Sequence, residues 1–334
     1  MRTPIKLAAY GGILAVAFAG ALGTGSVLGS PVPPAEETHN MEEMDGGSTS
    51  SSEAGAHSEM QPDQPTAGGE LPGGLMVSER GYTLQPETGI LPAGSATQLN
   101  FQILAADGEP VTEYEQSHDK DMHLIAVRSD TTGFQHVHPE LSEDGTWSVP
   151  VDLTAGTWRV FADFVPADNE SDEGLILGVD IAVAGEYTPE ELPAVSRTAE
   201  VDGYTVTLDG ELVPGAESEL TLSVSRDGEP VTDLQPYLAA YGHLVALRDG
   251  DLAYLHVHPA GTPGDGQTES GPAITFYTTV PSAGDYRLYL DFQHDGVVRT
   301  AEFTATADRA ETSADASEEA PEQEETTDEG HTDH

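Results

Sequence analysis

The strongest constraint on the fold is an internal repeat. The segment DGEPVT occurs at 107–112 and at 227–232, and HLIAVR and HLVALR begin at His123 and His243, the same 120 residues apart. HVHP also recurs at this offset, whereas GTWRVFADF and GDYRLYLDF lie 128 residues apart, because the second copy has eight extra residues in the loop GTPGDGQTESG. A repeat of about 110 residues indicates a duplicated domain rather than a solenoid.

Each copy contains short alternating segments separated by turn residues. In the second copy these include YTVTL, SELTLSVS, HLVALR, AITFYTTV and YRLYLDF, bounded by DG, PG, AG or HDG. Several short strands with regular turn signals and no helical period predict an antiparallel β-sandwich. The predicted fold class is all-β, with two tandem antiparallel β-sandwich domains of immunoglobulin-like or cupredoxin-like size.

Composition outside the repeats defines the remaining parts of the chain. Pro-, Gly-, Ser- and Glu-rich segments without hydrophobic period predict disorder on either side of the repeats. The predicted organisation is a signal-anchor at 1–30, an acidic stalk containing His and Met at 31–75, sandwich repeats at 76–187 and 199–307 joined by a linker at 188–198, and a disordered acidic tail at 308–334.

The N-terminus has the pattern of an export signal. Arg2 and Lys6 precede an uncharged, largely apolar stretch that includes residues 7–29. This stretch is long enough to cross a bilayer, and the positive residues would stay inside. We therefore expect a single-pass transmembrane helix with the C-terminal bulk outside the cell, and secretion after signal cleavage is the alternative.

Composition excludes several classes of site. The chain has no cysteine, which excludes disulfides and thiolate metal sites. Its 12 Lys and Arg against 59 Asp and Glu give a net charge of −47, so we expect no nucleic-acid partner. Any metal ion must be held by His, Met, Asp or Glu.

Six of the twelve histidines occupy repeated positions: His123, His136 and His138 in the first copy, and His243, His256 and His258 in the second. If Asp249-Gly250 is a two-residue hairpin turn, then His243 lies directly opposite His256. Directly opposed residues share a face, and His258 returns to that face two residues later. The same register pairs His123 with His136, so each copy is predicted to form a three-histidine cluster.

Three imidazoles at this spacing can coordinate copper or zinc. The alternative is structural, because an H-x-H-P segment at a strand end can also hydrogen-bond the backbone. Asp163 and Asp291 occupy matching positions and are candidate partners that orient an imidazole, although each could also be a solvated aspartate at a strand end. His118, Met122 and His294 occur in one copy only, and Met122 could offer a thioether.

The segments MHLIAVRSDTTGFQHVHPE and YLAAYGHLVALRDGDLAYLHVHP resemble an uncharacterised family of exported bacterial proteins, common in actinobacteria. Its members combine an "HL(I/V)" strand with an "H-x-HP" strand in a small β-sandwich and are often associated with copper or heavy-metal handling. The resemblance covers roughly residues 76–307. It implies a role for the six repeated histidines and for nothing else.

These observations favour a membrane-anchored, extracytoplasmic protein that binds copper or zinc through a three-histidine cluster in each repeat. The alternative function is an immunoglobulin-like structural or interaction protein of the cell surface, with an unknown protein partner. An enzyme is not expected, because the sequence contains no nucleophile motif, no Gly-rich phosphate loop and no H-E-x-x-H helix.

Overall fold

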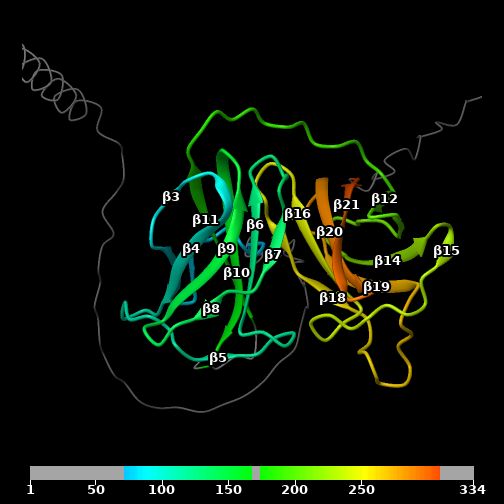
Figure 1. Cartoon of the computed structure of the whole chain (residues 1–334), viewed down its shortest axis with the longest axis horizontal. Helices are drawn as coiled ribbons and strands as arrows, with labels where there is room; N and C mark the ends of the chain where they lie inside the picture. The colour runs from blue at the N-terminus through cyan, green and yellow to red at the C-terminus, as the bar shows by residue number, and fades with distance from the viewer. Residues whose placement is uncertain (1–70, 168–173, 309–334) are drawn as a thin grey trace, which may run out of the picture. The chain divides into compact units, whose positions relative to one another are not determined.

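The computed structural model describes residues 71–167 and 174–308 (Figure 1). The predicted signal-anchor, nearly all of the predicted stalk and most of the predicted tail lie outside the described residues. All regular elements within the described ranges are β-strands. None of the described residues forms a helix that is long and apolar enough to cross a membrane.

The described part of the first repeat contains eleven strands: β1 (Ser78–Glu79), β2 (Tyr82–Pro86), β3 (Ile90–Leu91), β4 (Gly94–Leu104), β5 (Tyr114–Glu115), β6 (Met122–Arg128), β7 (Gln135–Val137), β8 (Glu140–Leu141), β9 (Thr146–Leu153), β10 (Gly156–Pro166) and β11 (Leu175–Val183). One sheet has the order β1-β2-β4-β9-β8. The other has the order β3-β11-β10-β6-β7, with β5 paired to β10. Among the described residues of this repeat, only the pairing of β3 with β11 is parallel.

The second repeat contains ten strands: β12 (Thr198–Val201), β13 (Tyr204–Asp209), β14 (Glu217–Arg226), β15 (Glu229–Pro230), β16 (Gly242–Arg248), β17 (Tyr254–Leu255), β18 (Val257–Pro259), β19 (Ala273–Thr279), β20 (Gly284–His294) and β21 (Val297–Ala307). One sheet has the order β12-β13-β14-β19-β18, with β15 paired to β14. The other has the order β17-β16-β20-β21.

Alternation along the strands builds a separate apolar core in each repeat. In β9, for example, Trp147, Val149 and Val151 are buried while the residues between them are more exposed. The two sheets of a repeat pack these inward residues against each other, as expected for a sandwich. The all-β prediction of two tandem β-sandwiches is therefore confirmed.

A third apolar cluster joins the two repeats. Its buried members are Ile125, Val127 and Phe161 from the first repeat and Val245, Leu247, Leu252, Tyr254 and Tyr289 from the second. The Tyr289 hydroxyl donates a hydrogen bond to the carbonyl oxygen of Thr131, and its ring stacks on Phe134 with 4.0 Å between centroids. We call this group the inter-repeat cluster.

The inter-repeat cluster predicts that single truncations within it destabilise the protein strongly. Replacing Ile125, which is 1% exposed, by Ala should lower the free energy of unfolding by about 2–5 kcal/mol, because it leaves a cavity between the repeats. The matched control is Ile90→Ala, at a position 68% exposed, which should change stability by at most about 0.5 kcal/mol. Urea denaturation measures both, and equal effects would contradict the packing described.

Candidate metal centre

Strand β6 directs His123 toward the second repeat. Every residue of β6 is buried, but alternate residues enter different clusters. Leu124 and Ala126 belong to the core of the first repeat, whereas Ile125 and Val127 belong to the inter-repeat cluster. Because side chains alternate along a strand, His123 shares the face of Ile125 and Val127. The histidine therefore lies at the edge of the contact between repeats.

The register between β6 and β7 differs from the prediction by two residues. Ile125 is opposite His136, and Leu124 is opposite Val137, so His123 aligns with His138 rather than with His136. The connecting loop is wider than a two-residue turn, and Thr131 within it has a φ of 65°. An even shift leaves every side chain on its original face. The three histidines therefore still meet, although the predicted pairing was wrong.

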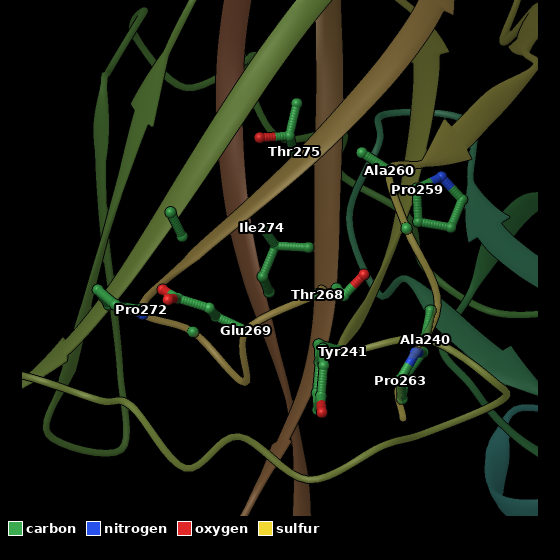
Figure 2. Close-up of a pocket in the computed structure, with 13 residues that line it drawn as sticks. Ala240, Tyr241, Pro259, Ala260, Pro263, Thr268, Glu269, Pro272, Ile274 and Thr275 are labelled. Carbon is green, nitrogen blue, oxygen red and sulfur yellow. The ribbon is translucent and has the colours of Figure 1, made fainter. Parts of the chain in front are cut away.

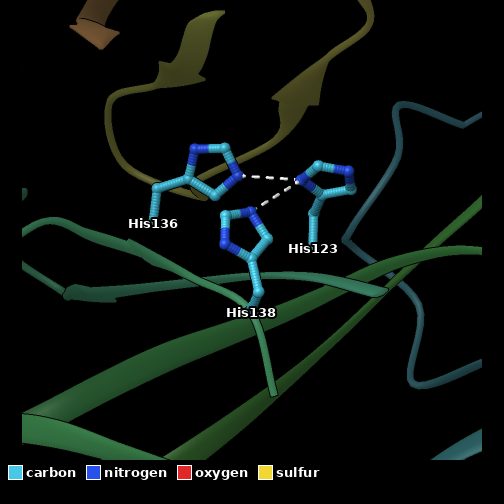
Figure 3. Close-up of side chains that lie close together, drawn as sticks. All are labelled: His123, His136 and His138. Atoms are coloured by element: carbon cyan, nitrogen blue, oxygen red, sulfur yellow. Dashed lines mark hydrogen bonds between the residues drawn. The ribbon is translucent and has the colours of Figure 1, made fainter. Parts of the chain in front are cut away.

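The ring nitrogens of His123, His136 and His138 converge (Figure 3). His123 Nδ1 lies 3.0 Å from His136 Nε2 and 3.3 Å from His138 Nε2. Nitrogens bound tetrahedrally to one ion at 2.0–2.1 Å are about 3.3 Å apart, so this spacing is close to that of a loaded site. We call this group the triad.

Two hydrogen bonds determine which nitrogens of the triad carry protons. His123 Nε2 donates to the carbonyl oxygen of Ser117 at 2.9 Å, because a carbonyl can only accept. His136 Nδ1 donates to the Asp291 carboxylate at 2.9 Å. In neutral rings this leaves lone pairs on His123 Nδ1 and His136 Nε2, the two atoms that face each other. Partners of this kind orient metal-binding histidines and raise their basicity.

The surroundings keep His123 and His138 in the neutral form that a metal ion requires. Burial lowers the pKa of His123 to about 3, and the neighbouring histidines lower it further against the effect of the Ser117 carbonyl. Burial likewise lowers the pKa of His138 to about 4, together with the charge of His136. Both rings are therefore unprotonated at neutral pH and available as ligands.

The second repeat does not assemble an equivalent triad. His243 Nε2 donates to the carbonyl oxygens of Tyr237 and Leu238, much as His123 does to Ser117. However, β17 ends at Leu255, and β18 pairs with β19 in the opposite sheet. This early change of sheet leaves His256 and His258 exposed. Within the described ranges, the triad is the only group of three such residues whose ligand atoms all lie within 4.8 Å.

The predicted turn at Asp249-Gly250 also differs from the structure. Leu247 pairs with Tyr254, so the loop is longer than two residues and His243 does not oppose His256. Asp251 does not continue the strand, because its carboxylate accepts hydrogen bonds from Arg248 and from the Ala253 amide. Leu252 closes the loop with a φ of 56°.

The matched aspartates occupy equivalent strand positions but have different environments. Asp163 is opposite His123, and Asp291 is opposite His243. Asp291 is 3% exposed, contacts His136 of the other repeat and also accepts a hydrogen bond from the Thr300 hydroxyl. Burial raises the pKa of Asp163 to about 6. The contact of Asp291 with the triad crosses between repeats, and no pattern within one repeat indicates it.

The unrepeated residues also have distinct positions. Met122 is 1% exposed in the core of the first repeat, on the opposite face of β6 from His123, so its thioether is not part of the triad. His294 bonds the Tyr204 hydroxyl and the Asp233 carboxylate, within the second repeat. His118 lies beside the histidines, with its ring centroid 5.2 Å from that of His243.

A pocket of about 300 Å³ lies in the second repeat, next to its HVHP segment (Figure 2). Pro259 and Tyr241 line it together with Thr268 and Glu269 from the loop that is longer in this copy. Its lining includes one carboxylate and no imidazole. The pocket is therefore separate from the triad and brings together no acid–base pair of its own.

Several solved structures are similar to this chain at low identity. FdeC, an Escherichia coli adhesin, is 15% identical, with 70% of this chain and 65% of that chain covered and a TM-score of 0.21. Invasin, a bacterial integrin-binding protein, is 15% identical, with 68% and 39% covered and a TM-score of 0.20. A DUF4426 family protein from Pseudomonas aeruginosa is 7% identical, with 33% and 96% covered and a TM-score of 0.24. Scores this low carry no argument about function.

No curated protein matches the sequence. One family model matches both repeats, at residues 77–175 and 199–309, and these two segments include all six repeated histidines. They amount to more than half of the chain. The chain therefore belongs to the family described as Domain of unknown function (DUF8832).

Proposed function

We propose that this protein binds one copper or zinc ion at the triad and handles that ion outside the cytoplasm. The observation that carries the proposal is the 3.0 Å approach of His123 Nδ1 to His136 Nε2, while the opposite nitrogen of each ring donates a hydrogen bond. Two lone pairs this close repel each other, and a cation between them removes the repulsion. A third imidazole, His138, faces the same point.

The donor set supports a first-row ion of intermediate softness. All three ligands are imidazoles, which suit both zinc and copper, and the chain has no cysteine to supply a thiolate. The Irving–Williams order makes Cu(II) the tighter-binding of the two divalent ions. Three protein ligands leave a fourth position for water or for a ligand from a partner that delivers or receives the ion.

An extracytoplasmic location is part of the proposal and rests on the sequence. The basic and apolar N-terminus, outside the described residues, has the pattern of an export signal that is either retained as an anchor or cleaved. We propose a binding role rather than a catalytic one.

The second candidate function is an interaction protein in which the histidines are structural. The hydrogen bond from His136 to Asp291 favours it, because this bond already links the two repeats without an ion. In that case the triad would stabilise the contact between the sandwiches, and metal binding would be weak and insensitive to substitution in the triad.

Replacement of one triad ligand distinguishes metal binding from a structural role of the histidines. His136→Ala should lower the affinity for Cu(II) and Zn(II) by more than about 100-fold. Loss of a residue that only hydrogen-bonds a metal ligand typically costs about 10–100-fold, and loss of the ligand itself should cost more. The matched control is His256→Ala, at the equivalent but exposed position of the second repeat, which should leave this tight binding unchanged. Competition titration against a chelator measures both. Equal affinity in the wild type and in His136→Ala would establish the structural function.

Asp291, the carboxylate from the second repeat, should strengthen the affinity of the triad for its ion. Asp291→Asn should weaken ion binding by about 10–100-fold while the stoichiometry is retained, because His136 loses the partner that orients its ring. Asp163→Asn, at the matching position of the first repeat, is the control and should have a smaller effect. Equal losses in the two variants would show that general electrostatics, rather than this hydrogen bond, sets the affinity.

The ion-free protein should become less stable in mild acid. An unfolded imidazole titrates near pH 6.5, whereas the folded pKa is about 3 for His123 and about 4 for His138. The unfolded state therefore takes up protons that the folded state does not. The resulting stability is fully present above about pH 6.5 and falls as the pH decreases toward about 4.

Urea denaturation of the chelator-treated protein at a series of pH values tests this dependence. His123→Asn should make the decrease in stability shallower, because one of the two groups that resist protonation is gone. His258→Asn, at an exposed position, should leave the decrease unchanged. The same slope in the wild type and in His123→Asn would contradict the prediction.

A further inference from the structure

His118 and His243 form a second pair of imidazoles beside the triad, with one member from each repeat. Their ring centroids are 5.2 Å apart and their planes are inclined by 87°. The triad pair His123 and His138 has nearly the same geometry, at 5.0 Å and 83°. Imidazoles that share one tetrahedral ion have centroids about 5 Å apart, given metal–nitrogen bonds of 2.0–2.1 Å.

This pair is too far from the triad to share its ion. The His243 ring lies 6.1 Å from that of His136 and 6.4 Å from that of His123, compared with 5.0–5.3 Å within the triad. The centroid distances differ by 0.8–1.4 Å, which exceeds the tolerance of about 0.2 Å expected for metal–ligand distances. These distances fit a second ion bound by His118 and His243. They do not fit His243 as a fourth ligand of the ion in the triad.

The backbone places His118 in a tight turn directly before β6. His118 has a φ of 51° and Asp119 a φ of 63°, two consecutive non-glycine residues in the left-handed region. Reciprocal bonds between Ser117 and Lys120 close this turn, and His123 Nε2 donates to the Ser117 carbonyl. The second repeat has the same turn geometry at Leu238 and Ala239, so this is a shared hairpin turn, and it carries a histidine only in the first repeat.

The hydrogen bonds of His243 leave one nitrogen available. Its Nε2 donates to the carbonyl oxygens of Tyr237 and Leu238, so the lone pair of the neutral ring is on Nδ1. Its partner His118 is exposed, which gives an ion in solution direct access to the pair. A half-buried ligand and an exposed ligand together make a site that an ion can enter and leave more easily than the triad.

We propose that His118 and His243 bind a second first-row transition-metal ion, copper or zinc, next to the triad. The two protein ligands leave coordination positions open to water or to an incoming donor, and the site takes one ligand from each repeat. This inference goes beyond the proposed function and does not require an ion in the triad. The two sites should therefore be lost independently.

Equilibrium dialysis of the full chain against Zn(II), followed by metal analysis, tests the second site. His118→Ala and His243→Ala should each remove one equivalent of bound ion and leave the tight equivalent unchanged. The double variant His123→Ala/His136→Ala should show the reverse, losing the tight equivalent and keeping the weaker one. His331→Ala, near the C-terminus, is the control for binding by histidines outside the repeats and should change neither of these two equivalents.

Cobalt(II) substitution gives an independent measurement on the same variants. The visible absorption of bound cobalt should decrease by one component in His118→Ala and by a different component in His123→Ala/His136→Ala. Because His118 is exposed, its replacement should leave the thermal unfolding temperature unchanged, so a lost equivalent cannot be attributed to misfolding. Retention of all equivalents in His118→Ala would overturn the inference. Loss of the tight equivalent in His243→Ala, with none lost in His118→Ala, would also overturn it, by making His243 a triad ligand.

Discussion

Alternate side chains of β6 and β16 pack into different apolar clusters, and the rest of the structure depends on this division. Leu124 and Leu244 belong to the cores of their own repeats, while Ile125 and Val245 meet in the inter-repeat cluster. Both strands are thus covered on two faces, one within the sandwich and one by the other repeat. The repeats pack through these faces because leaving them exposed would present a contiguous apolar patch to solvent.

Histidines at the edge of such an interface need hydrogen bonds, because a buried polar group without a partner is costly. For His123 the partner is a backbone carbonyl in its own repeat, and for His136 it is Asp291 in the other. These bonds satisfy the outer nitrogens and leave the inner nitrogens facing each other. The contact between repeats therefore creates the arrangement that favours a cation.

Duplication produced two copies of the motif, but the copies now differ in where the strand after the hairpin changes sheet. In the first repeat β7 continues beside β6 through Val137, which keeps His136 and His138 near His123. In the second repeat the corresponding strand crosses to β19 from Val257 onward. One copy therefore assembles the triad, while the other contributes a supporting carboxylate to it.

The sequence by itself determined the duplication, the β-strands and the shared face of His123, His136 and His138. These features follow from local alternation, and a register shift of two residues, such as that between β6 and β7, does not move a side chain to the other face. The tertiary structure alone decided that one triad forms rather than two, and that Asp291 supports it. Both depend on pairing and packing between segments far apart in the chain, which the period-two pattern of a single strand does not encode.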